Sequence, residues 1–347
     1  MRPVRVLIID DSMTMRRLIR LALSGDPRID VVGEARDAQQ ARERLGELRP
    51  DVLTLDVEMP GQSGLDFLER LMAVRPMPVI MVSTETHHGT AAALEALSMG
   101  AVECVGKPIN AAAAADFAML PDLVVAASTA RIAPRSAGQQ RPAGTPPPTG
   151  FIWNGRFVLI GSSTGGVDAL ERILSEYPSN CPPTVITQHM PAGFLTSFAQ
   201  RLNTRIRPTI QLASTGAPLL PGNVYLAPGG DTHLAISSPR APVCHLVDAD
   251  KRNGHRPSVD YLFETGAQLG DKAIAVMLTG MGRDGADGML AMRRARAICL
   301  AQDEATSVVW GMPRVAWESG AVDRLVPLPE IANQILSAAG RAMRAAS

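Results

Sequence analysis

The sequence has few aromatic residues, no excess of charge of either sign and no long hydrophobic run. Only 4 % of its 347 residues are aromatic, so aliphatic and methionine side chains must fill its cores. Lys plus Arg total 34, as do Asp plus Glu, whereas nucleic acids and membrane surfaces require net or clustered positive charge in their partners. No apolar run approaches the ~18 residues of a membrane span. We therefore expect a protein that is not membrane-embedded and that has no nucleic-acid partner.

Cysteine is also scarce. The four cysteines, at positions 104, 181, 244 and 299, are widely spaced and include no C-x-x-C pair. This pattern favours reduced thiols over a disulfide framework or a zinc site. The N-terminus lacks the features of a secretory signal peptide, because Asp10 and Asp11 interrupt the segment that should stay apolar. Both observations predict a cytoplasmic protein.

The length of the chain favours two domains, and its composition indicates where they divide. Eight of the 18 residues from 133 to 150 are Pro or Gly, and none is aromatic or a large aliphatic. Such a segment buries too little apolar surface to offset its ordering entropy, so it predicts a solvated linker. The expected organisation is a first domain at 1–132, a linker at 133–150 and a second domain at 151–347.

Apolar strands and helical patterns alternate through the first domain. This alternation predicts a doubly wound α/β fold with a five-stranded parallel sheet covered by helices on both faces. We expect strands at 4–9, 30–34, 52–55, 78–82 and 101–105, with helices at 15–23, 38–48, 65–74 and 90–99 between them. An Ala-rich run at 111–131 predicts a last helix, with Pro121 as a break.

Polar residues follow four of these five strands. Ligands bind at the carboxyl ends of the strands in such sheets, so these residues are expected to converge: Asp10, Asp11, Asp56, Ser83 and Lys107. Three converging carboxylates repel one another unless a hard cation lies between them, and Mg²⁺ prefers oxygen ligands. The nearby lysine indicates that a further anion, such as a phosphoryl group, arrives there.

The segments IIDDS, LDVEMPGQSGLDFL, PVIMVS and GKP, at this spacing, resemble a response-regulator receiver domain. The resemblance implies Asp56 as phosphoacceptor and Asp10, Asp11, Asp56 and the backbone carbonyl of Glu58 as Mg²⁺ ligands. It also implies Ser83 as the switch hydroxyl and Lys107 as a phosphoryl contact. One departure is Cys104, at a position that is usually aromatic in receivers, so a switch that flips an aromatic ring is not expected here.

In the second domain, a strand at 157–160 leads into the turn GSSTGG and then a helix that ends near residue 175. A dinucleotide-binding loop would require G-x-G-x-x-G and an acidic residue at the end of the next strand, where Gln188 and His189 stand instead. A phosphate loop would require Gly-Lys-Ser/Thr, which is absent. The third interpretation is a nucleophile turn, because residues 161–165 match G-x-S-x-G.

A nucleophilic serine requires a base and an acid that orients the base. His189 ends the next expected strand, 183–187, and Asp284 follows the strand expected at 273–278. The remaining histidines have weaker contexts: His87 and His88 in a receiver loop, and His233, His245 and His255 in polar or turn-rich segments. The order Ser, His, Asp disfavours the ordinary α/β-hydrolase fold, whose order is Ser, Asp, His.

The segments GSSTGG, VITQHMPAGF, NVYLAPGG and MLTGMGRDGADG, behind a receiver and a linker, closely resemble the chemotaxis protein-glutamate methylesterase (CheB) family. The resemblance implies a second doubly wound α/β domain with a mostly parallel sheet. It implies Ser163 as nucleophile, His189 as general base and Asp284 as the acid, with no cofactor for ester hydrolysis. Ser162 replaces the alanine common in the family. The amides of Thr164, Met281 and Gly282 are candidate oxyanion donors.

The resemblance further implies a phosphorylation-activated enzyme that demethylates glutamate methyl esters on chemoreceptors and deamidates receptor glutamines. Its partners would be a chemotaxis histidine kinase and methyl-accepting chemoreceptors. The linker would span about 25 Å as a flexible coil and about 55 Å as extended polyproline, so the receiver would be able to cover the catalytic rim and leave it. Two alternatives stay open at this point: the same chemistry in a non-motility pathway, and an inert binding module.

Overall fold

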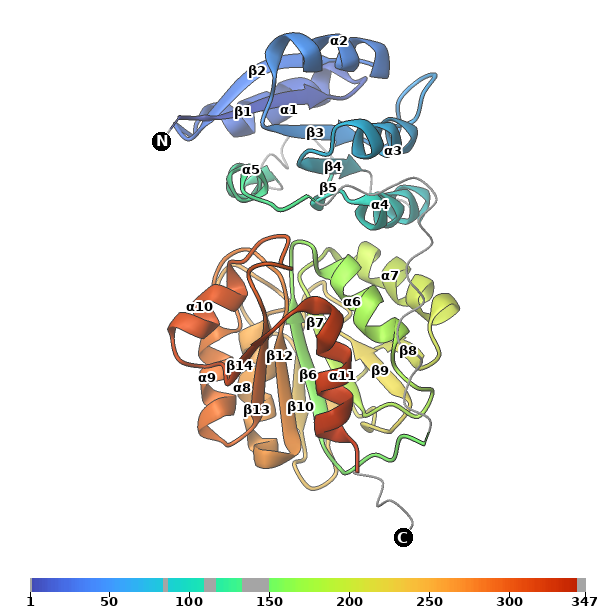
Figure 1. Cartoon of the computed structure of the whole chain (residues 1–347), viewed down its shortest axis with the longest axis vertical. Coiled ribbons are helices and arrows are strands. Elements are labelled where there is room, and N and C mark those ends of the chain that lie inside the picture. The colour runs from blue at the N-terminus through green and yellow to red at the C-terminus, as the bar shows by residue number, and fades with distance from the viewer. Residues whose placement is uncertain (1, 84–86, 109–116, 133–149, 342–347) are drawn as a thin grey trace. The chain divides into compact units, whose positions relative to one another are not determined.

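The computed structural model describes residues 2–83, 87–108, 117–132 and 150–341. The chain divides into two compact units, Met1–Gln140 and Arg141–Ser347, each with its own sheet and its own core (Figure 1). The division falls within the expected linker, and residues 133–149 of that linker lie outside the described residues. The proposed boundaries 1–132, 133–150 and 151–347 therefore stay a prediction.

The first unit contains the predicted five-stranded parallel sheet. Its strand order is β2-β1-β3-β4-β5, so the order reverses between β1 and β3, and this reversal places a crevice at the carboxyl ends of these two strands. The strands are β1 (Val4–Ile9), β2 (Ile29–Ala35), β3 (Val52–Asp56), β4 (Val79–Ser83) and β5 (Glu103–Gly106). All five residues of β3 and all five of β4 are buried, as strands covered on both faces should be.

Short polar side chains fix where three of the receiver helices begin. Ser12, Asp37 and Ser63 each accept a hydrogen bond from a backbone amide three residues later, which satisfies a donor that the first turn would leave unpaired. The helices are α1 (Met13–Ser24), α2 (Ala38–Leu48), α3 (Gly64–Val74), α4 (His87–Met99) and α5 (Leu120–Ser128).

Two local expectations for this unit differ from the structure. His87 and His88, expected in a loop, begin helix α4. The last strand begins at Glu103, because Ala101 and Val102 instead join α4 to the sheet. The expected break at Pro121 stays a prediction, because the helical residues expected before it, 111–116, lie outside the described residues. Helix α5 begins at Leu120 with Pro121 in its first turn, where a proline loses no intrahelical hydrogen bond.

The second unit contains a seven-stranded parallel sheet of order β14-β13-β12-β6-β7-β9-β8. Its strands are β6 (Phe157–Ser162), β7 (Thr184–Gln188), β8 (Thr209–Leu212), β9 (Asn223–Leu226), β12 (Ala273–Met277), β13 (Ile298–Gln302) and β14 (Arg324–Val326). A separate antiparallel pair, β10 (His233–Ser237) and β11 (Val243–Val247), makes the domain mostly parallel, as expected. The strand order reverses between β6 and β12, which makes their carboxyl ends the expected site.

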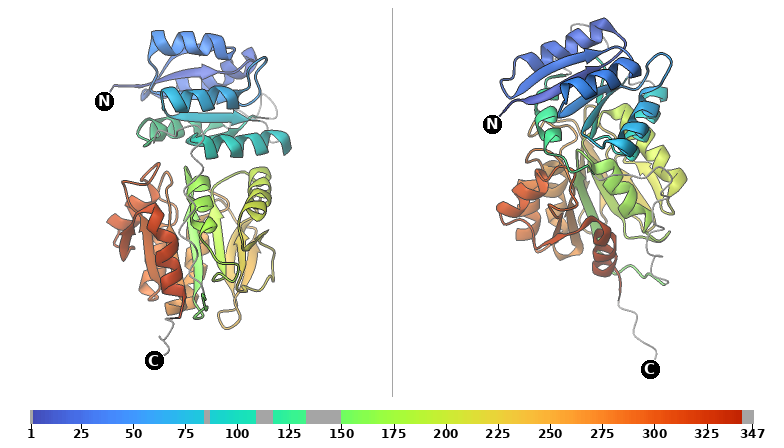
Figure 2. Two further views of the ribbon diagram at one scale, coloured as in Figure 1. Left: turned by 45° about the vertical axis from the view of Figure 1, so that its right-hand side comes forward. Right: turned by 45° about the horizontal axis from the view of Figure 1, so that its top comes forward.

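Helices cover this sheet on both faces (Figure 2). Helix α11 packs beside α6, and α8 packs beside α9. The helices are α6 (Gly166–Ser175), α7 (Ala192–Arg205), α8 (Val259–Gly266), α9 (Ala286–Arg294), α10 (Met312–Glu318) and α11 (Leu328–Ala339), with a 3₁₀ segment at Ala267–Lys272. No helix in the described part of the chain is long and apolar enough to cross a lipid bilayer.

Candidate functional site

Three neighbouring strands of the second sheet carry the predicted catalytic residues at one edge. Ser163 directly follows β6 and His189 directly follows β7, while Asp284 lies in the loop between β12 and α9. Backbone hydrogen bonds tie the strand ends together: the Ser163 amide donates to the Thr279 carbonyl at 3.1 Å, and the His189 amide donates to the Ser162 carbonyl at 3.0 Å. The parallel topology therefore brings residues distant in sequence to one rim.

His189 and Asp284 form a buried pair. His189 Nε2 lies 2.8 Å from Asp284 Oδ2, and the two side chains are only 6 % and 1 % exposed. Burial alone would raise the pKa of Asp284, but the hydrogen bond and charge of His189 and hydrogen bonds from Ser258 and Val259 hold it below its usual range. Asp284 is thus a carboxylate, and Nε2 is the nitrogen that donates to it.

The other ring nitrogen of His189 is left free to act as a base. Nδ1 is buried and has no hydrogen-bond partner among the described residues. Because Nε2 carries the proton, Nδ1 carries the lone pair that can accept a proton from a nucleophile. A neutral imidazole in this tautomer is the form that general-base catalysis requires.

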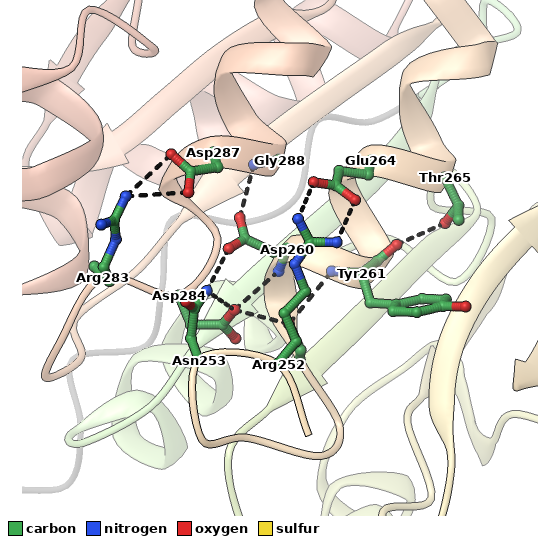
Figure 3. A network of polar contacts seen from close by, with 11 residues as sticks. Arg252, Asn253, Asp260, Tyr261, Glu264, Thr265, Arg283, Asp284, Asp287 and Gly288 are labelled. Atoms are coloured by element: carbon green, nitrogen blue, oxygen red, sulfur yellow. Dashed lines mark hydrogen bonds and ion pairs between the residues drawn. The ribbon is translucent and has the colours of Figure 1, made fainter. Parts of the chain in front are cut away.

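The acid is held by several further donors, as Figure 3 shows in part. The Ser258 hydroxyl donates to Asp284 Oδ1 at 2.7 Å, and the Val259 amide donates to Oδ2 at 2.6 Å. The Asn253 side-chain amide bridges two acids, at 3.2 Å from Asp284 Oδ1 and 2.6 Å from Asp260 Oδ2. Burial raises the pKa of Asp260 to about 6, and the nearby charge of Asp284 adds to this increase. The network fixes the carboxylate that orients His189.

The two adjacent serines have different surroundings. Ser162 is fully buried, and its hydroxyl donates to Gln188 Oε1 at 2.6 Å. The Gln188 amide in turn donates to the carbonyls of Ser163 and His189, at 3.0 and 3.1 Å. Ser162 therefore holds the backbone of the neighbouring strand ends, whereas the side chain of Ser163 makes no hydrogen bond within the described part of the chain and is 8 % exposed.

A glycine in the loop after β12 lets this loop approach the Ser163 side chain. A Cβ placed on Gly280 would lie 2.8 Å from Ser163 Cβ and 2.4 Å from Met312 Sδ, so any larger residue would displace the serine. Three backbone amides near Ser163 donate to no acceptor in the residues that the structure covers: those of Thr164, Met281 and Gly282. The predicted oxyanion donors are therefore available for hydrogen bonding.

One residue that the sequence did not single out joins this site. The ring of His255 stacks on the ring of His189, with centroids 3.8 Å apart and an interplanar angle of 5°. The other histidines of this domain do not contact His189 in the described residues. His233, on β10, accepts a hydrogen bond from the Ser258 amide at Nδ1 and donates from Nε2 to the Asp250 carbonyl, and His245 is exposed on β11. His255 has only a weak context in the sequence, because its ring reaches His189 only through the way its loop folds.

The acidic cluster predicted in the receiver is also present. One carboxylate oxygen from each of Asp10, Asp11 and Asp56 lies within 4.8 Å of the others. Lys107 Nζ lies 2.7 Å from Asp56 Oδ2 and 3.1 Å from Asp10 Oδ2, and the Glu58 amide donates to Asp56 Oδ1 at 3.2 Å. Ser83, buried at the end of β4, pairs through its carbonyl with the Lys107 amide at 2.7 Å.

The receiver acids carry more negative charge than the protein alone neutralises. Burial raises the pKa of Asp56 to about 6, with Lys107 opposing and Asp10 adding to the increase, and burial also raises the pKa of Asp10. A hard divalent cation fits this set of oxygen donors, in which Asp10 and Asp56 are buried and Asp11 is exposed, and it would relieve their repulsion. Cys104 is buried on β5, and burial raises the pKa of its thiol well above the usual value.

Comparison with known proteins identifies the family. The profile of the CheB methylesterase family matches residues 158–335, and that of the response regulator receiver domain matches residues 6–116. The chain belongs to the CheB methylesterase family. It is 54 % identical over 337 residues to the protein-glutamate methylesterase/protein-glutamine glutaminase 1 of Rhizobium johnstonii, covering 96 % of each chain. It is 52 % identical to the protein of the same name from Caulobacter vibrioides, covering 98 % of this chain and 99 % of that one.

A solved structure of the CheB methylesterase catalytic domain of Thermotoga maritima is also similar. It has 39 % sequence identity, covers 53 % of this chain and 98 % of that chain, and superposes with a TM-score of 0.51. The second domain thus has the fold of this CheB catalytic domain, which was solved without a receiver.

Proposed function

We propose that this CheB-family chain hydrolyses glutamate methyl esters on chemoreceptors, and that phosphorylation of Asp56 by a chemotaxis histidine kinase activates it. The observation that carries the proposal is the buried His189–Asp284 hydrogen bond, 2.8 Å long, at the strand ends beside Ser163. The names of the full-length relatives from Rhizobium and Caulobacter support the same substrate class and reaction.

The reaction begins with attack of Ser163 Oγ on the side-chain carbonyl carbon of a glutamyl methyl ester. His189 Nδ1 takes the serine proton, and Asp284 stabilises the imidazolium that forms. The imidazolium then gives its proton to the methoxy oxygen, and methanol leaves an acyl-enzyme. A water molecule then attacks the acyl-enzyme while His189 takes its proton. The bond to Ser163 Oγ breaks, this oxygen regains the proton, and the receptor glutamate is released.

The developing oxyanion requires hydrogen-bond donors already in place. The Thr164 amide lies in the turn between Ser163 and α6, two residues before the helix begins at Gly166 and so near the positive end of the helix dipole. The amides of Met281 and Gly282 come from the loop that packs against Ser163. A glutamine side chain would react by the same steps with ammonia as the leaving group, which is the basis for proposing a second, glutaminase activity.

The receiver supplies the control. Asp56 is the proposed phosphoacceptor, and Asp10, Asp11, Asp56 and the Glu58 carbonyl would hold Mg²⁺, which neutralises the charge of the incoming phosphoryl group. Lys107 lies within ion-pair distance of Asp56 and would contact the phosphoryl oxygens. Ser83, at the end of the adjacent strand, is the proposed switch hydroxyl.

An inert binding module is disfavoured. Burial of a carboxylate against a histidine costs desolvation free energy, and a domain without catalysis would not require this arrangement. The direct test is methanol release from membranes that contain methylated receptors. The wild-type chain should release methanol, and Ser163→Ala should not. Equal release by the two chains would overturn the proposal.

A further inference from the structure

Resting on the proposed esterase function, we propose that His255 is a positioning residue, whose ring holds the plane of the general base His189 by stacking on it. The rings are nearly parallel, 5° apart in orientation, with centroids 3.8 Å apart, which is van der Waals contact over the whole face. The hydrogen bond to Asp284 fixes one nitrogen of His189 but still allows the ring to rotate about that bond. A flat surface against the face of the ring removes this freedom.

The loop that carries His255 is rigid for reasons visible in its sequence. Arg252 and His255 exchange two backbone hydrogen bonds, of 3.0 and 2.9 Å, around the dipeptide Asn253-Gly254. Both central residues have positive φ, 50° and 81°, as in the type I′ turn that Asn-Gly favours. Arg252 is anchored to helix α8 by a bidentate ion pair with Glu264 (Figure 3). This four-residue turn is called the 252–255 turn below.

The turn serves both members of the catalytic pair. Asn253 places its amide on the carboxylate of Asp284, while His255, two residues later, places its ring on His189. One small loop therefore contacts both the acid and the base, and adds to the other groups that hold them. Since a displacement of about 1 Å in such a constellation can lower a rate about 100-fold, a rigid support has a direct kinetic consequence.

His255 acts here as a flat, uncharged surface. Burial lowers the pKa of His255 to about 4, the charge of His189 adds to this, Asp284 opposes it, and Lys251 lowers it further. The ring is thus neutral at pH 7. A neutral ring does not repel the imidazolium that His189 becomes during the reaction, whereas a charged one would.

The test compares two replacements at position 255 in the full-length chain. His255→Phe keeps a flat ring and should keep kcat within about threefold of wild type. His255→Ala removes the ring and should lower kcat about tenfold or more with KM unchanged, because the proposed role is to orient the base and not to bind the receptor. The matched control is His245→Ala, which removes an exposed histidine from the same domain and should leave kcat unchanged.

A second readout does not depend on the receptor. The rate at which a fluorophosphonate probe labels Ser163 should fall in His255→Ala and recover in His255→Phe, while both variants should keep the wild-type far-UV circular dichroism and a cooperative thermal unfolding of the second domain, which report a folded domain. Equal loss in the Phe and Ala variants would assign the role to the ring nitrogens and overturn the proposal, as would equal retention in both. Absence of methanol release by the wild-type chain would instead overturn the esterase function itself.

Discussion

At the scale of single residues, the adjacent hydroxyls of Ser162 and Ser163 have separate tasks. Ser162→Ala removes a hydrogen bond to Gln188 but leaves the proton path from Ser163 to His189 intact. We expect Ser162→Ala to keep at least about a third of the wild-type kcat and to lose about 1 kcal/mol of stability. Ser163→Ala should keep its stability and lose at least about a thousandfold in kcat. Methanol release and thermal unfolding of the two variants check this, and a Ser162→Ala chain as inactive as Ser163→Ala would contradict it.

The acids of the receiver make a prediction about pH. A metal ligand must lose its proton before it binds, and the pKa of Asp56 is raised to about 6. Below this pH the carboxyl holds a proton that Mg²⁺ must displace, so Mg²⁺ affinity should fall roughly tenfold between pH 7.5 and pH 5. Calorimetric titration of the full chain with Mg²⁺ measures this. In Asp56→Asn the affinity should be weaker and depend less on pH; an affinity for the wild-type chain that is constant over this range would count against the metal site.

At the scale of elements, backbone strain in the 252–255 turn tests whether this turn supports the His189–Asp284 pair. Gly254 has φ 81° and open space around its Cα, so Gly254→Ala introduces strain without a clash and should lower stability by about 1 kcal/mol. Gly216, with φ 88° and equally open surroundings, is the matched control. Both alanine variants should lose similar stability, but only Gly254→Ala should lower kcat. Equal kcat in the two variants would show that the turn does not support the catalytic pair.

Much of the element structure follows from local signals. Helix α2 has the predicted bounds, 38–48, because Asp37 caps its start and an apolar stripe runs through it. The predicted start of β12 at Ala273 agrees as well. Pro121 stands in the first turn of α5, and because a proline can either end a helix or begin one, the sequence alone does not decide which side of it is helical.

The candidate site was predictable where residues follow parallel strands, and not where a loop folds back. The positions after β6, β7 and β12 converge by topology alone, so Ser163, His189 and Asp284 were predicted to share a rim. The arrival of His255 at His189 depends on two positive φ angles and an ion pair to α8. The Asn-Gly dipeptide favours the turn itself, but residue type and spacing do not encode the ion pair to α8 or the ring on which His255 comes to lie.

At the scale of the whole molecule, the proposed phosphorylation site and the proposed esterase site belong to separate compact units of one chain. We expect the unphosphorylated receiver to restrain the esterase, so deletion of residues 1–150 should raise basal methanol release. The deleted chain should also be insensitive to acetyl phosphate. The related catalytic domain from Thermotoga maritima was solved alone, so this truncation is a reasonable unit to purify. A truncated chain slower than the unphosphorylated full chain would mean that the receiver contributes positively to catalysis or receptor docking.

The central claim is that Ser163 hydrolyses receptor methyl esters under control of Asp56. The most direct measurement is methanol release from methylated receptor membranes by the full chain in Mg²⁺ buffer, with and without acetyl phosphate, beside Asp56→Asn and Ser163→Ala. We expect acetyl phosphate to raise the rate of the wild-type chain, Asp56→Asn to keep an unresponsive basal rate, and Ser163→Ala to release no methanol. A wild-type rate that ignores acetyl phosphate, or release that survives Ser163→Ala, would contradict this claim.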